Sequence, residues 1–220
     1  MRIKFFELGL VEFAKAYSLQ KELRERVGQD EYEHAALICR HYPVITLGRP
    51  ADKENILAGE NELAAKGIKV FSLERGGDVT YHGPGQLMVY PVFNLGLLKR
   101  DLHWFLRLLE EAIISCLSGF GIAAARRDGL TGVWVGEKKI ASIGIAVKNW
   151  VSWHGLSLNV KKGDLDNFKL IRPCGMDIEM TAMEEVARKE VDMEVVARTM
   201  QRLLEQAVNP RRSGAPVSWR

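Results

Sequence analysis

A cysteine and a lysine are the two reactive side chains that stand out in this sequence. Cys174 lies between Pro173 and Gly175, where a strand-like run ends. A turn of this kind can present a side chain at the surface. The neighbouring Arg172 is cationic and favours the ionised thiolate. On spacing alone, a single cysteine is more often inert than catalytic.

Lys139 opens a strand that otherwise consists of Ile, Ala, Ser and Gly. Its side chain is expected either in solvent or at the edge of a pocket, and the adjacent Lys138 fits the solvated alternative better. The small residues Ala141, Ser142 and Gly144 permit another group to approach this strand closely. If Lys139 faces Cys174, its ammonium lowers the pKa of the thiol, and the lysine can then act as acid or base.

A glycine-rich loop, RGGDVTYHGPGQ, occupies residues 75–86 between two apolar runs. Glycine permits positive φ and close backbone approach to a ligand, and Pro84 stiffens the exit. The loop predicts a substrate cradle; a tight hairpin with solvated polar side chains is the alternative. His82 and His154 each precede a glycine, without the partners that a metal site needs, so we expect positioning roles.

Composition indicates an ordinary globular domain. The 220 residues are 47% hydrophobic and 27% charged, which suffices for one core. We find neither a membrane span nor a signal peptide and expect a cytoplasmic protein. Cys39 and Cys116 lie in apolar patterns and are expected to be buried free thiols, as three widely spaced cysteines suit neither zinc nor disulfides. Residues 126–174 are rich in Lys and Arg, which favours an acidic partner over nucleic acid; a scattered, solvated charge pattern is the alternative.

Hydrophobic periodicity predicts an α+β fold, a single domain with a mixed β-sheet flanked by helices. Residues 1–207 form this domain, and residues 208–220 a flexible basic tail. Glu110 is expected on the polar face of its helix. The helices are expected at residues 11–27, 60–66, 102–117 and 193–207, and the strands at residues 35–39, 43–47 (a pair in one sheet), 68–73, 87–93, 132–135, 139–147 and 153–160, with turns at Gly136 and near Asn149.

Four motifs together resemble one enzyme family. RGGDVTYHGPGQ, GVWVGEKKIASIGIAV, WHGLSLNV and RPCGM occur in this order, after an upstream PVITLGR, and cover residues 44–176. The combination resembles the octanoyltransferases of lipoate biosynthesis, also called lipoyl(octanoyl) transferases. That family has the biotin/lipoate protein ligase-like fold, a mixed sheet flanked by helices, which agrees with the elements expected above.

The resemblance implies a function and a set of site residues. An octanoyl group would pass from octanoyl-acyl carrier protein to Cys174 as a thioester. Lys139 would lower the thiol pKa and transfer protons. The acceptors would be lysines on lipoyl domains of 2-oxo-acid dehydrogenase complexes and on the glycine cleavage carrier protein. No cofactor, metal, nucleic acid or membrane is implied, and a monomer is expected. The implied substrate-binding residues are Arg75, Gly76, Gly77, Asp78, Val79, Thr80, Tyr81, His82, Ser142, Ile143, Gly144, Gly155, Leu156 and Ser157.

Some features stay open at this level. The oxyanion donors are expected either in residues 76–82 or around Cys174. The acyl groove is expected along residues 140–145 and 87–89. Three other functions are possible: a ligase that adenylates a free acid, an amidotransferase between two proteins, and a catalytically inactive scaffold for lipoyl domains. Cys174 together with Lys139 speaks against the ligase.

Overall fold

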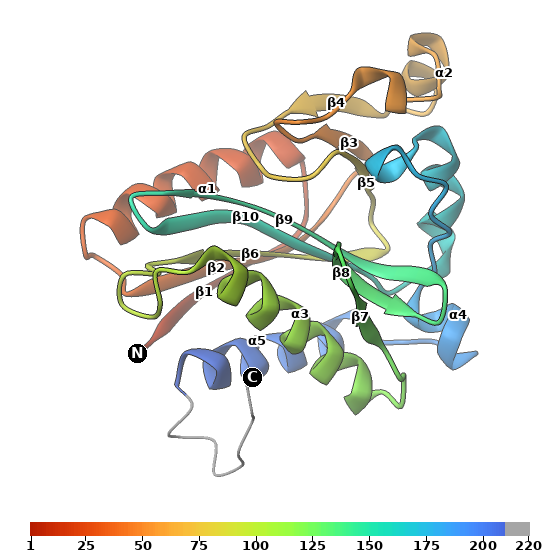
Figure 1. Ribbon diagram of the computed structural model, residues 1–220. Helices are drawn as coiled ribbons and strands as arrows, with labels where there is room; N and C mark the ends of the chain where they lie inside the picture. Colours follow the sequence, from red (N-terminus) through yellow and green to blue (C-terminus); the bar gives the residue numbers. More distant parts are fainter. Residues whose placement is uncertain (210–220) are drawn as a thin grey trace.

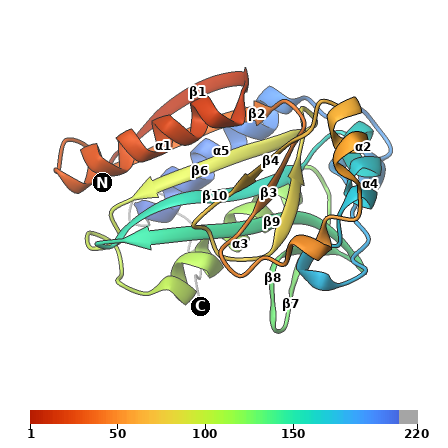
Figure 2. The same ribbon diagram turned by 90° about the horizontal axis from the view of Figure 1, so that it is seen from above.

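The apolar runs of the chain assemble into two sheets, seen in a computed structural model (Figures 1 and 2). The structure describes residues 1–209, apart from the side chain of Cys174. The described residues form a seven-stranded sheet in which β1 and β2 are parallel and the other neighbours antiparallel. Its strands, in spatial order, are β1 (Ile3–Val11), β2 (His34–His41), β6 (Gln86–Phe93), β10 (Val151–Asn159), β9 (Lys138–Lys148), β8 (Leu130–Val135) and β7 (Ala125–Arg127).

Helices cover both faces of this sheet. Figure 1 shows α3 (Leu102–Gly119) and α5 (Met193–Val208) on one face and α1 (Phe13–Gly28) on the other. The apolar side of α3 packs with α5 into the largest core cluster, as an amphipathic helix requires. The helices α3 and α5 begin where Asp101 and Asp192 accept hydrogen bonds from backbone N–H groups of the first turn, which are otherwise unsatisfied.

A small sheet lies over the same face as α1 (Figure 1). Its three strands within the described residues are β4 (Lys69–Ser72), β3 (Val44–Leu47) and β5 (Val79–His82), in that spatial order. It packs against α2 (Glu60–Ala65) and the 3₁₀ segment η2 (Lys162–Leu170). The remaining short elements are η1 (Lys53–Asn55), η3 (Pro173–Gly175) and α4 (Met183–Ala187).

Much of the predicted organisation is confirmed. The chain is a single α+β domain with a mixed sheet flanked by helices. The predicted meander exists as β8, β9 and β10, with left-handed backbone at Gly136 and Asn149 in its turns. Cys39 and Cys116 are buried free thiols.

Several predictions were wrong. The strands expected at residues 35–39 and 43–47 do form, but in different sheets, since β2 pairs with β1 and β6 whereas β3 pairs with β4 and β5. The strand β1 was not expected, and β5 lies inside the stretch taken as a loop. Glu110 is 1% exposed rather than on a solvated face, because Arg126 and the backbone N–H of Gly132, both outside its helix, donate to its carboxylate there.

The last helix, α5, ends one residue later than expected. Val208 is the last residue of α5 and is buried, while most of the predicted tail, residues 210–220, lies outside the described residues. Among the described residues, no helix combines the length and apolarity needed to cross a bilayer.

Candidate active site

A cleft lies where the small sheet meets the main sheet. It encloses about 230 Å³, and its walls include parts of β5, β6, β9 and β10. Three stretches that are distant in sequence meet here. From the predicted set, the cleft is lined by Lys139, Arg75, Gly77, Asp78, Val79, Thr80, His82, Ser142, Ile143, Gly144, Gly155, Leu156 and Ser157.

Two residues of the predicted substrate-binding set do not line the cleft. The Gly76 N–H donates to the carbonyl of Ile145 over 2.9 Å, which ties the loop to β9. Tyr81 is fully buried; its hydroxyl accepts from Asn167 over 2.9 Å, and its ring meets Phe168 edge-on. Both residues therefore support the walls of the cleft without lining it.

Glycine is required where the loop crosses the sheet. A Cβ atom at Gly144 would lie 2.8 Å from the carbonyl oxygen of Gly76, and one at Gly155 would lie 2.1 Å from that of Val89. Real side chains do not tolerate such distances. The small residues along β9 and β10 therefore serve close packing of backbone on backbone.

Arg75 places a cation in the wall of the cleft. It is 7% exposed, and its guanidinium donates to the carbonyl and hydroxyl of Thr46 over 2.7 and 2.9 Å and to the carbonyl of Gly76 over 3.0 Å. These bonds compensate for the loss of hydration. They also join the start of the loop to β3.

His82 begins a chain of buried polar contacts. Its Nδ1 lies 3.1 Å from Oε1 of Gln86, whose amide donates to Asn159 over 3.0 Å; Asn159 donates in turn to the carbonyl of Thr181 over 2.9 Å. Burial, followed by the charges of His41 and Arg75, lowers the pKa of His82 to about 3. His82 is therefore neutral at physiological pH.

Lys139 lies inside the cleft at the start of β9. It is 5% exposed, and its Nζ lies 4.9 Å from the centre of the Trp134 ring, a cation–π distance. Its backbone N–H donates to Glu179 and its carbonyl accepts from Thr181. Lys138 instead pairs with Glu179 and Glu185 and is half-exposed.

The turn that carries Cys174 borders the same cleft. Cys174 lies in η3, and the flanking Pro173 and Met176 line the cavity. The side chain of Cys174 is outside the described residues. Asn55 holds this turn, since its carbonyl accepts from the Arg172 N–H over 2.7 Å while its amide donates to Asp78 over 2.6 Å.

His154 lines another part of the cleft, below α1. Its φ is 57°, a left-handed value, and it is 2% exposed. Its ring stacks on that of Tyr17 at 5.7 Å, and its Nε2 lies 3.6 Å from a carboxylate oxygen of Glu74. Burial lowers the pKa of His154 to about 4, so the imidazole is neutral. The positioning role expected for it stays a prediction.

Sequence reasoning missed several residues of the site. Thr46, Trp134, Gln86 and Asn159 lie within the quoted motifs but were not singled out as site residues. Asn55 lies outside every motif, whereas Asn159 is a polar residue at the end of an apolar strand and could have been noticed. The expected groove is only partly right. Met88 and Ile143 line the cleft, whereas Leu87 and Ile140 lie in the core cluster beneath α3, to which Ile143 also contributes.

The arrangement suits acyl chemistry on a small apolar group. Ile143, Leu156 and Met88 provide apolar wall, and Lys139 provides an amine that can exchange a proton. In the described part of the chain, no three His, Cys, Asp or Glu side chains are grouped as metal ligands would be.

Comparison with known proteins identifies relatives of the chain. The model of the lipoyl protein ligase A/B catalytic domain matches residues 12–205. An octanoyltransferase of Solibacter usitatus is 47% identical over 80% of this chain and 80% of its own length. One of Caldicellulosiruptor saccharolyticus is 43% identical over 89% of this chain and 84% of its own.

Solved structures share the fold at low identity. A bipartite lipoate protein ligase of Thermoplasma acidophilum, studied with its E2 lipoyl domain, superposes with a TM-score of 0.74 at 18% identity, over 94% of this chain and 84% of that chain. The biotin protein ligase of Aquifex aeolicus gives a TM-score of 0.55 at 13% identity, over 95% and 70% of the two chains. These likenesses concern the fold alone.

Proposed function

The chain belongs to the lipoyl protein ligase A/B catalytic domain family and is an octanoyltransferase, and from this premise we propose that it works through an acyl-cysteine. Cys174 takes the octanoyl group from octanoyl-acyl carrier protein, and a lysine of a lipoyl domain receives it. The acceptors are lipoyl domains of 2-oxo-acid dehydrogenase complexes and the glycine cleavage carrier protein. The enzyme acts as a monomer, which light scattering at working concentration tests.

One observation carries the proposal. The buried Lys139 and the turn around Cys174 border one cleft together with three separate glycine-containing stretches. A lysine side chain that is 5% exposed must have a chemical or structural partner, since an unpaired buried ammonium is costly. A thiolate is a suitable partner, because each charge stabilises the other.

In the first step, the Cys174 thiolate and the Lys139 ammonium both react, so their ion pair is lost. The sulfur of Cys174 attacks the acyl carbon of the donor thioester, a new carbon–sulfur bond forms, and the bond to phosphopantetheine breaks. The departing thiolate takes a proton from Lys139, which is left as a neutral amine. Exchange of one thioester for another is nearly balanced, so the step needs no ATP.

The second step restores the ion pair. The amine of the acceptor lysine attacks the acyl carbon on Cys174, and neutral Lys139 takes the proton that this nitrogen loses. The carbon–sulfur bond breaks to give the amide and the Cys174 thiolate. Amide formation from a thioester is downhill and draws the sequence forward.

Oxyanion stabilisation is assigned to the loop rather than to the cysteine turn. The N–H groups of Gly76, Gly175 and Met176 already donate to carbonyls. In contrast, β5 pairs with β3 on one side only within its sheet, so alternate N–H groups of residues 79–82 point away from β3. These groups are the proposed donors.

Incubation with octanoyl-acyl carrier protein tests the proposal. Intact mass should show one octanoyl adduct, peptide mapping should place it on Cys174, and Cys174→Ser should abolish it. Lys139→Ala should slow adduct formation, by about 100-fold or more for loss of acid–base catalysis. An undiminished adduct in Cys174→Ser would refute the acyl-cysteine. Product formation from free octanoate only with ATP would instead support a ligase.

A further inference from the structure

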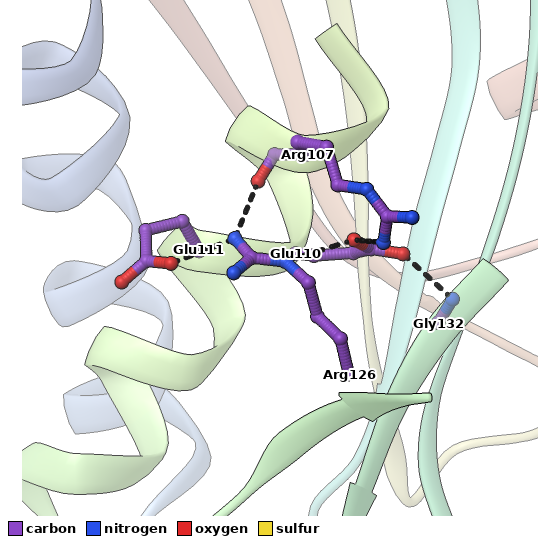
Figure 3. Close-up of polar contacts among 5 residues, drawn as sticks. All are labelled: Arg107, Glu110, Glu111, Arg126 and Gly132. Atoms are coloured by element: carbon purple, nitrogen blue, oxygen red, sulfur yellow. Dashed lines mark hydrogen bonds and ion pairs between the residues drawn. The ribbon is translucent and has the colours of Figure 1, made fainter. Parts of the chain in front are cut away.

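The carboxylate of Glu110 is buried and lies outside the cleft in which the reaction is proposed to take place. Glu110 is on α3 and is 1% exposed. Figure 3 shows its carboxylate between two arginines and the backbone of β8. Arg107 donates to Oε2 over 2.7 Å, Arg126 donates to Oε2 over 3.1 Å, and the Gly132 N–H donates to Oε1 over 3.1 Å.

The arginines keep the carboxylate in one orientation. Arg126 is held by two further bonds, to the carbonyl of Arg107 over 3.0 Å and to Glu111 over 2.7 Å. With both arginines on Oε2, the other oxygen is directed at the Gly132 N–H (Figure 3). The network therefore fixes one point of β8 relative to α3.

Gly132, the residue of β8 that the network fixes, lies against the side chain of Lys139. A Cβ atom at Gly132 would be 2.7 Å from Cε and 3.3 Å from Nζ of Lys139, and 2.6 Å from the carbonyl oxygen of Ala141. The φ of Gly132 is 127°, which other residues rarely adopt. Two positions further along β8, the Trp134 ring lies 4.9 Å from the same Nζ. This strand thus forms one wall around the amine.

We propose that Glu110 is a positioning residue for Lys139, acting through Gly132. By fixing Gly132, the carboxylate sets how closely β8 packs on the lysine side chain and hence where the ammonium stands. The inference rests on the proposed function, in which Lys139 activates Cys174. A displacement of a catalytic group by about 1 Å can slow a reaction by about 100-fold, so a small shift of this wall matters.

Glu110→Gln separates the role of the carboxylate from its volume. An amide has one acceptor oxygen, and the charged guanidinium groups compete for it more strongly than the neutral N–H of Gly132. The amide nitrogen then faces the Gly132 N–H, donor against donor, and the wall must move. Glu111→Gln is the matched control, since Glu111 bonds the same Arg126, whereas the Gly132 N–H donates to Glu110.

The test measures alkylation of Cys174 by iodoacetamide as a function of pH, assigned by peptide mapping, in wild type, Lys139→Ala, Glu110→Gln and Glu111→Gln. We expect Glu110→Gln to move the pH midpoint upward, in the direction of Lys139→Ala, and to slow acyl transfer about tenfold. Glu111→Gln should match wild type. Thermal unfolding checks that each variant is folded at the assay temperature.

The outcomes separate the proposed role of Lys139 from the positioning role of Glu110. If Lys139→Ala leaves the midpoint unchanged, the proposed function fails. If Lys139→Ala shifts it and Glu110→Gln does not, only the positioning role fails. Should Glu110→Gln not fold, Gly132→Ala tests the same contact from the other side, because its Cβ must displace the lysine; a wild-type midpoint there overturns the inference.

Discussion

Burial keeps two imidazoles of the cleft uncharged. The pKa of His82 is lowered to about 3 and that of His154 to about 4, in both cases mainly by burial and then by neighbouring positive charge. Neutral imidazoles can hydrogen-bond a substrate without adding charge beside Arg75. They also make the fold sensitive to acid, because unfolding releases these side chains to water.

Stability is therefore expected to fall as the pH falls from about 6.5 towards 4. In this window the unfolded chain, with a histidine pKa near 6.5, binds more protons than the folded chain. Each of the two histidines should remove about 2 kcal/mol of stability between pH 7 and pH 5. Urea unfolding at several pH values measures this. His154→Asn, which tolerates the left-handed backbone, should reduce the slope.

His103→Gln provides the comparison for that experiment, since His103 is exposed on α3. It removes an exposed imidazole where His154→Asn removes a buried one. Equal slopes for His154→Asn and His103→Gln would contradict the role assigned to burial.

At the scale of elements, Asn55 connects η1 to the cysteine turn. We expect Asn55→Ala to release Asp78 and to loosen the turn, although the backbone bond from Arg172 to Asn55 can persist. Hydrogen exchange of the peptide containing Arg172 should be faster, and octanoylation of Cys174 slower by about tenfold.

Glu54→Gln is a suitable control, because Glu54 is exposed in the same 3₁₀ turn. Its bond to Asp52 is made by the backbone N–H, which the substitution retains. Exchange and octanoylation rates should equal those of the wild type. Unaltered exchange at Arg172 in Asn55→Ala would show that the turn is held by other contacts.

Element prediction from sequence succeeded where the information is local. The apolar stripes of α3 and α5, and the strands of the meander, follow from periodicity within one segment. In contrast, β5 is four residues long among glycines, and it is a strand because β3 pairs with it. The burial of Glu110 depends likewise on Arg126 and Gly132, which no helical pattern contains.

Much of the lining of the cleft could be predicted for a related reason. Cys174, Lys139 and the glycine stretches are recognisable by residue type and order, and the cleft brings most of these stretches together. The residues that hold them, such as Asn55 and Thr46, have ordinary types. Their importance arises from a bond across the fold, which a single sequence does not encode locally.

At the scale of the whole molecule, the buried chain from His82 through Gln86 and Asn159 to Thr181 joins the small sheet, the main sheet and the segment after η3. Asn159→Ala should leave the Gln86 amide and the Thr181 carbonyl without these partners. Each unsatisfied buried group costs about 1–3 kcal/mol, so the unfolding free energy should fall by several kcal/mol in urea.

Asn61→Ala, on the exposed side of α2, is the control for this loss of an amide and should change stability by no more than about 0.5 kcal/mol. If Asn159→Ala is equally mild, water replaces the amide and the chain does not join the sheets.

Because Trp134 contacts Lys139, the fluorescence of Trp134 can report on the candidate active site. The indole of Trp134 is 2% exposed, lines the cleft and faces the amine of Lys139, for which a catalytic role is proposed. It experiences a local field that changes when that amine gains or loses its proton. Its emission should differ between the resting enzyme and the proposed acyl-enzyme. Each half of the proposed cycle could then be timed by rapid mixing, without attaching a dye to either protein substrate.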